Sequence, residues 1–380
     1  NGNINVLNGY QYSTSVALKG KWYQGTPSAG NGEQIEFGSM PTGLANPNLK
    51  WETSEQWDAG IDARFLSDRL SVGIDWYKKI TKDLLVQINP VPEIGVSSTW
   101  ANAGSVLNEG LEFELGWKDS IGDFHYSVNA NLATLKNDVL DLHSTLNRIE
   151  GTGGGVSGLN YKIRTAFEAG YPIWYFRGIK SAGIDSETGR PKYYNADGDI
   201  VDTVAEGDLQ YIGDALPDFT YGLTINMEYK GFDLIIFGNG TYGNDIFSLL
   251  YSADRTRSNT LKTYWENSWK KAGDNAKYPD LAKVKSDWWY WSSDNASIFD
   301  GSYFKIKQIQ LGYTLPMNLT KKALISNLRL FVSLDDFITF TKYPGCDPET
   351  ATTQSHNGMG YDAGTYPTTR KAVFGVNLTF

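Results

Sequence analysis

The chain has 380 residues, with 43 acidic and 34 basic side chains, so its formal net charge at pH 7 is −9. This charge argues against a nucleic-acid binder, which needs a basic face to neutralise phosphates. The single cysteine, Cys346, excludes an intrachain disulfide and a thiolate zinc site. Three scattered histidines argue against a multi-histidine metal centre: His125, His143 and His356.

Aromatic residues make up 14% of the chain, a content that argues against intrinsic disorder. The strongly apolar stretches, such as residues 234–237, are far shorter than the ~20 residues that a membrane-spanning helix needs.

The informative pattern is a strict alternation of apolar and polar residues. Between residues 219 and 229 the odd positions are Phe, Tyr, Leu, Ile, Met and Tyr, whereas the even positions are Thr, Gly, Thr, Asn and Glu. The same alternation runs through residues 54–65, 70–76, 111–118 and 124–132. Because successive side chains of a strand point to opposite faces, each run predicts a strand with one apolar and one hydrophilic face.

Five further strands are predicted at residues 171–184, 231–240, 303–315, 327–337 and 370–380. The apolar phase shifts between Ile306 and Ile309, which predicts a β-bulge there. The result is about ten strands, mostly 9 to 13 residues long. That length is roughly twice the usual ~5–6 residues and matches the ~9–11 tilted residues that cross a bilayer.

Alternation alone allows two architectures. A soluble sandwich packs the apolar faces inward, whereas an outer-membrane barrel turns them to lipid and lines a wet lumen with the hydrophilic faces. Three features favour the barrel: the length of the strands, the C-terminal strand that ends in Phe380, and the aromatic residues near the ends of the alternating runs. Those aromatic residues are Trp51, Trp76, Tyr77, Trp117, Tyr229 and Phe232.

The connections between the predicted strands favour the same choice. Short turns, such as residues 119–123 and the Lys230-Gly231 corner, separate long excursions. The long excursions cover residues 136–170, 185–217, 246–301 and 341–369. Compact domains rarely contain structureless loops beyond ~12–15 residues, whereas a barrel carries short turns on one side and long loops on the other. The sequence therefore predicts an all-β fold, a transmembrane antiparallel β-barrel.

Several motifs then resemble one family. The segment NPNLKWE at Asn46–Glu52 resembles the signature of SusC/RagA-type TonB-linked outer-membrane transporters. Further matching segments are DWYKK at 75–79, TKDLL at 81–85, NAG at 102–104, NEG at 108–110, IGDALPDF at 212–219, DGSYFKIK at 300–307, TKYPG at 341–345, DPE at 347–349 and YDAG at 361–364. The resemblance covers nearly the whole chain, in the family's order.

The resemblance implies that residues 1–380 are the C-terminal portion of a TonB-dependent receptor barrel, about the last ten of roughly 22 strands. The N-terminal plug, the early strands, the TonB-contacting segment and the export signal are then expected outside this chain. A second chain or further residues should supply them, because half a barrel would expose two strand edges at lipid depth.

The implied function is TonB-dependent import of oligosaccharides or peptides across the cell outer membrane. The implied partners are a SusD-like surface lipoprotein, TonB, the remainder of the barrel and plug, and outer-membrane lipid. Two alternatives stay open: a siderophore-type TonB-dependent receptor, and a secreted all-β glycan-active enzyme or binding module.

No catalytic motif is found in the sequence: it holds no nucleophile elbow, phosphate loop or histidine paired locally with a nucleophile. Carboxylates are plentiful, but Asp58, Asp62, Glu112 and Glu114 fall on the hydrophilic phase of strands, where charge is expected without an acid–base role. We therefore expect a transporter rather than an enzyme.

The chain ends on alternating residues that close with Phe380. A terminal aromatic residue on the last strand resembles the barrel-assembly signal of outer-membrane proteins, so Phe380 is the expected signal. The alternative is an ordinary final strand that happens to end in Phe.

A candidate calcium loop lies in one of the long excursions. Oxygen ligands at EF-hand-like spacing are offered by Asn195, Asp197, Asp199, the carbonyl of Val201 and Glu206. Ile200 stands where the sharp turn of such a loop needs glycine, and the family's fuller Asp-x-Asn-Gly-Asp-Gly run is not matched. The alternative is a polar surface turn.

A dense aromatic cluster follows Asp287 in the longest excursion: Trp288, Trp289, Tyr290 and Trp291. Flat rings stack on sugar faces, so these residues are candidates for ligand binding. The alternative is that they pack the loop against itself, against the lipoprotein or at the membrane boundary.

Overall fold

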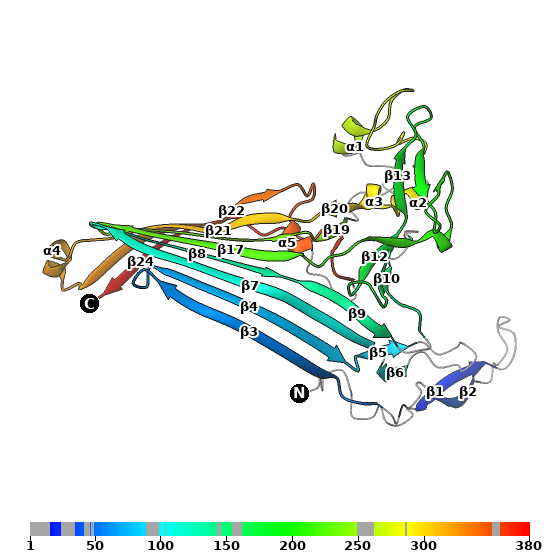
Figure 1. Cartoon of the computed structure of the whole chain (residues 1–380), viewed down its shortest axis with the longest axis horizontal. Coiled ribbons are helices and arrows are strands. Elements are labelled where there is room, and N and C mark those ends of the chain that lie inside the picture. Colours follow the sequence, from blue (N-terminus) through cyan, green and yellow to red (C-terminus); the bar gives the residue numbers. More distant parts are fainter. Residues whose placement is uncertain are drawn as a thin grey trace.

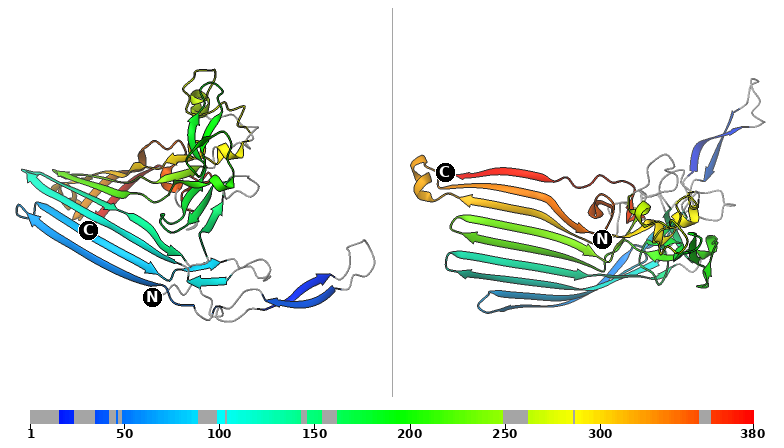
Figure 2. Two further views of the ribbon diagram at one scale, coloured as in Figure 1. Left: turned by 45° about the vertical axis from the view of Figure 1, so that its right-hand side comes forward. Right: turned by 90° about the horizontal axis from the view of Figure 1, so that it is seen from above.

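The structure, a computed structural model, describes residues 16–23, 35–41, 46, 49–88, 99–102, 104–142, 146–153, 162–248, 262–285, 287–351 and 358–380. Its largest feature is one curved antiparallel sheet with long strands, which Figures 1 and 2 show as a single open layer. The described part of this sheet has ten strands in the spatial order β24-β22-β21-β18-β17-β8-β7-β4-β3, with β9 also paired to β7.

The sheet follows the alternating segments of the sequence closely. Its strands are β3 (Thr53–Phe65), β4 (Leu70–Lys82), β7 (Gly104–Ile121), β8 (Phe124–Thr134), β9 (Lys136–Leu142), β17 (Phe219–Tyr229), β18 (Phe232–Tyr242), β21 (Tyr303–Thr314), β22 (Asn327–Thr341) and β24 (Lys371–Thr379). The predicted all-β fold with long antiparallel strands is therefore confirmed.

Tight turns join neighbouring strands at one end of the sheet. Lys230 and Gly231 connect β17 and β18 with φ of 47° and 87°, the two positive values that a type I′ hairpin turn requires. Glycine is also needed at position 231 because a Cβ there would lie 2.8 Å from the Thr314 carbonyl oxygen. The turn thus fixes the register in which Tyr229 faces Phe232.

The predicted bulge is confirmed. The register of β21 shifts between Ile306 and Gln308 on its β22 side, and β18 shows the matching shift between Phe237 and Gly238. The extra residue, Lys307, lets Ile306 and Ile309 keep to one face although they are three positions apart.

Two details of the predicted strands are wrong. Residues 171–184 do not form one strand: Trp174, with a positive φ of 54°, precedes β12 (Tyr175–Gly178), and a break at Ile179, which bridges to Ser293, separates β12 from β13 (Lys180–Ile184) in a different sheet. The predicted 136–170 excursion begins instead with β9, which continues the path of β8 beyond Leu135 and pairs with β7.

The sheet has two faces of opposite character. The outer face, defined by the residues in phase with Phe113 and Leu223, is apolar and uncovered: Trp57 is 71% exposed, Leu115 51% and Phe374 79%. The inner face contains the residues in phase with Glu112 and Glu114. A sandwich would bury the apolar face between two layers, and the described strands form no second layer over it, so the sandwich alternative is excluded.

Aromatic side chains of the outer face gather in two belts. At the short-turn end the rings of Phe232 and Tyr313 are in contact, tilted with respect to each other, at a centroid distance of 4.4 Å, near Tyr229. Nearer the other end Tyr221 stacks on Phe304 at 5.6 Å. Eight residues separate Tyr221 from Tyr229, or about 26 Å of strand. An apolar band of about 25 Å between aromatic girdles is typical of outer-membrane barrels.

The long connections build a lobe at the other end of the sheet, drawn mostly in green to yellow, with α5 in orange, in Figure 1. It contains β10 (Ile149–Gly153), β11 (Arg164–Phe167), β12 and β16 (Gln210–Gly213) in one sheet; β13, β14 (Pro191–Tyr194) and β15 (Ile200–Val201) in a second; and β19 (Asp245–Ser248), β20 (Ile298–Asp300) and β23 (Tyr361–Asp362) in a third. Its helical segments are η2 (Glu206–Asp208), α1 (Lys262–Asn267), α2 (Trp288–Trp291), α3 (Asp294–Ser297) and α5 (Pro348–Ala351).

The remaining elements lie outside this lobe. They are the β1 (Val16–Tyr23) and β2 (Ile35–Pro41) pair, the β5 (Leu85–Ile88) and β6 (Thr99–Asn102) pair, and α4 (Met317–Thr320) with η3 (Lys321–Ala323) between β21 and β22. No helix within the described ranges combines the length and the apolar character needed to cross a membrane.

Candidate solute-binding face and loop lobe

The inner face of the sheet carries a row of carboxylates with glycines between them. Gly73 pairs with Asp62 on one side and Glu114 on the other, while Gly60 lies opposite Asp75. A Cβ at Gly60 would sit 1.7 Å from Asp75 Oδ1, so glycine leaves the room that this acidic side chain occupies. The predicted strand carboxylates thus share one hydrophilic surface, suited to a dissolved solute.

Two adjoining hollows of about 540 and about 1010 Å³ lie in this face near the short turns. Both are lined by His125, Ser127, Asn226 and Glu228. Their polar lining extends the hydrophilic surface along the length of the strands.

The lobe rests on the inner face. Val106 of β7 is in phase with Glu112 and pairs with Val139 of β9. Both valines are buried in a cluster with Phe167, against which Trp174 also packs. The four-stranded sheet of the lobe therefore stands over the polar side of the long strands and not over their apolar side.

One cavity of the lobe, here called the arginine cavity, has a volume of about 460 Å³ and is lined by Arg148, Glu150, Gly151, Arg164, Arg177, Glu206, Gly207 and Leu209. Arg148 Nε lies 2.7 Å from Glu150 Oε1, and Arg177 Nη1 lies 3.7 Å from the same oxygen. Only 12% of the Arg177 side chain is exposed. The cavity therefore brings three guanidinium groups together, of which that of Arg177 is largely removed from water.

Beside it, three rings form what we call the tyrosine stack: Tyr171, Tyr175 and Tyr211, with centroid distances of 4.7 to 6.0 Å. The hydroxyl of Tyr175 donates to Glu168 and that of Tyr211 donates to Asp214, each at 2.7 Å. Burial and the hydrogen bond to Glu168 raise the pKa of Tyr175. Tyr171 and Tyr211 remain 38% and 39% exposed, so the held rings offer surface for stacking.

An acidic group lies behind Tyr211. The backbone N–H of Asp245 donates to the Asp214 carbonyl at 2.7 Å. Burial, followed by the charge of Asp214, raises the pKa of Asp245 to about 7. Burial likewise raises the pKa of Asp214, with a further contribution from Asp218.

This shift predicts how stability depends on pH. The folded-state pKa of Asp245 is higher than its ordinary value of 3.8, so the folded state binds more protons than the unfolded state between the two values. The contribution to stability is therefore full below about pH 4 and is lost as the pH rises through 7. Each unit of pKa difference is worth about 1.4 kcal/mol.

We expect the lobe's unfolding temperature to fall between pH 5 and pH 8, and to fall less in an Asp245→Asn variant. Thermal unfolding at both pH values measures this, with Glu187→Gln, an exposed carboxylate of the same lobe, as the control. The same pH dependence in wild type and Asp245→Asn would contradict the expectation.

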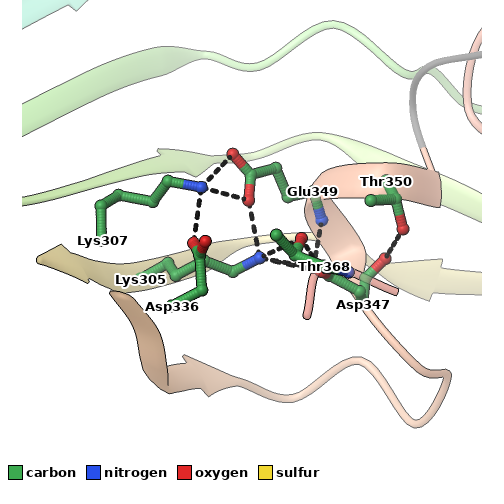
Figure 3. Close-up of polar contacts among 7 residues, drawn as sticks. All are labelled: Lys305, Lys307, Asp336, Asp347, Glu349, Thr350 and Thr368. Atoms are coloured by element: carbon green, nitrogen blue, oxygen red, sulfur yellow. Dashed lines mark hydrogen bonds and ion pairs between the residues drawn. The ribbon is translucent and has the colours of Figure 1, made fainter. Parts of the chain in front are cut away.

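A second polar network, here called the lysine latch, ties the last long loop to the inner face (Figure 3). Lys305 Nζ lies 2.9 Å from Asp347 Oδ2, 2.6 Å from Glu349 Oε2 and 3.1 Å from Thr368 Oγ1. The Lys305 side chain is 2% exposed. Lys307, the bulged residue, contacts Glu349 at 3.0 Å and Asp336 at 2.7 Å.

The latch satisfies its buried charges by pairing. Burial by itself would raise the pKa of Asp347, but the hydrogen bonds from Lys305 and Thr368 outweigh burial and lower it. Because Lys305 is on β21 whereas Asp347 and Glu349 accompany α5, the network holds α5 against the sheet.

The structure places the aromatic cluster of residues 288–291 within α2, in the hydrophobic core of the lobe. Tyr290 is fully buried and Trp291 is 8% exposed, while Trp288 and Trp289 are partly buried against that core. Asp287 caps the helix through its side chain, which accepts from the N–H groups of Trp289 and Tyr290. Ligand contact by these four residues stays a prediction.

The residues of the calcium prediction are divided between two places. Asn195 Oδ1 accepts from the Asp199 N–H at 2.7 Å, closing the turn between β14 and β15 in which Asp197 is exposed. Glu206 lines the arginine cavity instead. Among the described residues there is no group of three or more His, Cys, Asp or Glu side chains placed to hold a metal.

Calcium binding thus stays a prediction for Asn195, Asp197, Asp199, Val201 and Glu206. If the loop binds calcium, calorimetric titration of the intact protein will show heat that disappears in an Asp197→Ala variant. No heat in the wild type would remove the idea.

Phe380 follows β24, the edge strand of the described sheet, and is 82% exposed. Its role as an assembly signal stays a prediction. His143 and His356 lie outside the described residues.

Sequence reasoning missed the arginine cavity and the tyrosine stack. Arg148, Arg164 and Arg177 are separated by more than ten residues each, without a motif that marks them. Lys305 and Lys307 lie in one recognised segment, DGSYFKIK, and their partners Asp347 and Glu349 lie in another, DPE, but nothing in the sequence indicated that the two segments meet.

A single curved layer of long antiparallel strands, apolar outside and polar inside, defines part of a transmembrane β-barrel. Comparison with known proteins gives the family. The family model described as "TonB dependent receptor-like, beta-barrel" matches residues 3–200. This chain therefore belongs to the TonB-dependent receptor β-barrel family.

Similar proteins agree with this assignment. The chain is 31% identical to TonB-dependent receptor P3 of Formosa agariphila over 376 residues, which are 92% of this chain and 36% of that protein. It is 27% identical to TonB-dependent receptor SusC of Bacteroides thetaiotaomicron, over 88% of this chain and 32% of that protein. The predicted resemblance to SusC/RagA-type receptors is thus confirmed.

Among solved structures, that of the RagAB peptide transporter matches with a TM-score of 0.77 and 23% identity, covering 98% of this chain and 39% of that chain. This match shows that the fold is shared. The chain spans about a third of the length of the curated relatives it matches.

Proposed function

We propose that this chain is the C-terminal portion of the barrel of a TonB-dependent importer in the cell outer membrane. The observation that carries the proposal is the sheet itself, whose exposed apolar face suits lipid and whose polar inner face suits a hydrophilic solute. The described edges β3 and β24 would be completed by the remaining strands of a longer receptor.

The proposed cargo is an oligosaccharide or a peptide. One matched structure is that of a peptide transporter, and one matched relative is a SusC receptor. The lobe over the inner face presents aromatic rings and charged side chains where a solute would enter the lumen. Within it, Trp288 and Trp289 are partly exposed and are candidates for ligand contact. Transport, and not catalysis, is the proposed activity.

The proposed partners are a SusD-like surface lipoprotein, TonB acting through a plug outside this chain, and outer-membrane lipid. Purification of the full-length receptor in detergent tests this proposal. We expect an outer-membrane protein that copurifies with a SusD-like lipoprotein, and uptake of its solute that stops when TonB is deleted. Recovery in the soluble fraction, or uptake that persists without TonB, would contradict it; a receptor without a lipoprotein would favour the siderophore-type alternative.

A further inference from the structure

A hollow of about 480 Å³ lies in the apolar outer face of the sheet, a volume within the ~300–1,000 Å³ that is usual for small-ligand sites. We call it the Ala130 groove, because Ala130 is the smallest apolar side chain of its lining. Three strands that run side by side, β7, β8 and β17, form most of it (Figure 1). Their apolar lining residues are Phe113, Leu115, Ala130, Leu132, Tyr221 and Leu223.

The groove is open because the ring of Tyr221 is held away from it. The Tyr221 hydroxyl donates to the carbonyl oxygen of Tyr303 on β21 at 3.2 Å, so the ring crosses β18. Gly240 of β18 makes this possible, since a Cβ there would lie 2.9 Å from Tyr221 Cζ. Phe304 stacks on the same ring. Ala130 lies on the other side of β17, where the ring no longer covers the sheet.

The depth of the groove places it among acyl chains. Ala130 is the register partner of Leu223, which lies two residues from Tyr221 of the lobe-side aromatic belt. Two residues of a strand span about 7 Å. The groove therefore lies inside the apolar band, in the half that is nearer the lobe, below the level at which aromatic girdles meet the headgroups.

A hollow attracts a chain for a reason that a smooth lipid-facing surface does not offer. Lipid tails are as apolar as leucine, so contact with lipid alone brings no hydrophobic gain. The lining of a hollow, however, lacks contact atoms until something enters it, and many weak van der Waals contacts then add up. A single flexible chain reaches the floor at Ala130, whereas the surface of a second barrel would be stopped by the larger side chains of Phe113, Leu115 and Leu132.

We infer that the Ala130 groove binds one acyl chain of a membrane lipid from the lobe-side leaflet and retains it longer than the surrounding lipid. This inference rests on the proposed orientation of the outer face towards lipid and adds a specific lipid site to it. Ala130 supplies the floor of the site. Tyr221 keeps it open through its bond to β21.

The test uses the full-length receptor with its lipoprotein, reconstituted in vesicles of phosphatidylethanolamine that carries a diazirine in one acyl chain. After washing in dodecyl maltoside, native mass spectrometry counts the lipid that remains, and irradiation followed by peptide mapping locates it. We expect one retained lipid, cross-linked to β7, β8 or β17. Ala130→Phe fills the floor and should reduce retention about tenfold or more, a change of one order of magnitude in Kd.

Ala63→Phe is the matched control, because it places the same ring at the same depth of the outer face outside the groove. The register shows this: Ala63 pairs with Val72, Val72 with Leu115, and Leu115 with Ala130. This variant should keep the retained lipid. Tyr221→Phe removes only the hydroxyl that holds the ring over β18, and it should weaken retention less than Ala130→Phe. Gel mobility of unheated samples shows whether each variant is folded.

No retained lipid, the same retention in wild type and Ala130→Phe, or an equal loss in Ala63→Phe would overturn the inference. So would a receptor dimer that Ala130→Phe separates, or occupation of the groove by the lipoprotein's own acyl chains. The orientation of the outer face is tested separately, by the cost of an arginine on each face of β17. Unequal costs at the two faces without a retained lipid would contradict only the groove.

Discussion

An Ile225→Arg substitution in the full-length receptor is expected to lower the stability of the barrel by about 2–4 kcal/mol, the cost of an arginine at the bilayer midplane. Ile225 lies midway between Tyr221 and Tyr229, the two ends of the apolar band on β17, and it pairs with Val128 and Ile236. An arginine there would project into lipid, where neither water nor a carboxylate can solvate it.

Thr224→Arg is the matched control, since Thr224 precedes Ile225 on the same strand and points to the inner face next to Asn129. We expect a cost below about 1 kcal/mol there, because the new charge meets a polar, wet surface. Urea unfolding in lipid vesicles, together with the gel mobility of unheated samples, measures both variants. Equal losses at the two positions would contradict the assignment of the outer face to lipid.

A Lys305→Met substitution is expected to release the loop that carries α5. The change leaves buried Asp347 without its lysine, whereas Glu349 keeps Lys307, and breaking one side of a buried ion pair costs about 3–5 kcal/mol. Because the latch joins a loop to a sheet that is held by many other contacts, we expect local opening and not loss of the barrel.

Hydrogen exchange of residues 344–351 and 358–370 measures this opening, and it should become faster in Lys305→Met. Lys371→Met is the control, because Lys371 is an exposed lysine of the same sheet, on β24, two strands away from β21. Replacing the partners as well, in Lys305→Met with Asp347→Leu and Glu349→Gln, should restore part of the protection, since no buried charge is then left unpaired. Unchanged exchange in the single variant would show that the latch does not hold the loop.

The long strands were predictable because their signal is local. A period of two along residues 219–229 needs no knowledge of the partner strands, and the shift between Ile306 and Ile309 identified a bulge from the sequence alone. The prediction failed at residues 171–184, where Trp174 has a positive φ and the chain passes at Ile179 from one sheet of the lobe to another.

The candidate site was less predictable because its residues come from separate segments. Arg148, Arg164 and Arg177 meet at one cavity only after three strands of the lobe pair. The aromatic residues 288–291 stood out in the sequence, yet Tyr290 and Trp291 are core residues in the fold. A cluster of aromatic residues is conspicuous in the sequence, but only the structure shows which of its members are exposed and can contact a ligand.

The sequence by itself therefore determined the strands, their two faces and the family to which the chain belongs, because strand periodicity and short motifs are properties of consecutive residues. Only the tertiary structure decided which face the lobe covers, which acids accompany Lys305, and which arginines oppose each other across a strand pair. These relations depend on register and on contacts between residues far apart in the chain, which no local pattern encodes.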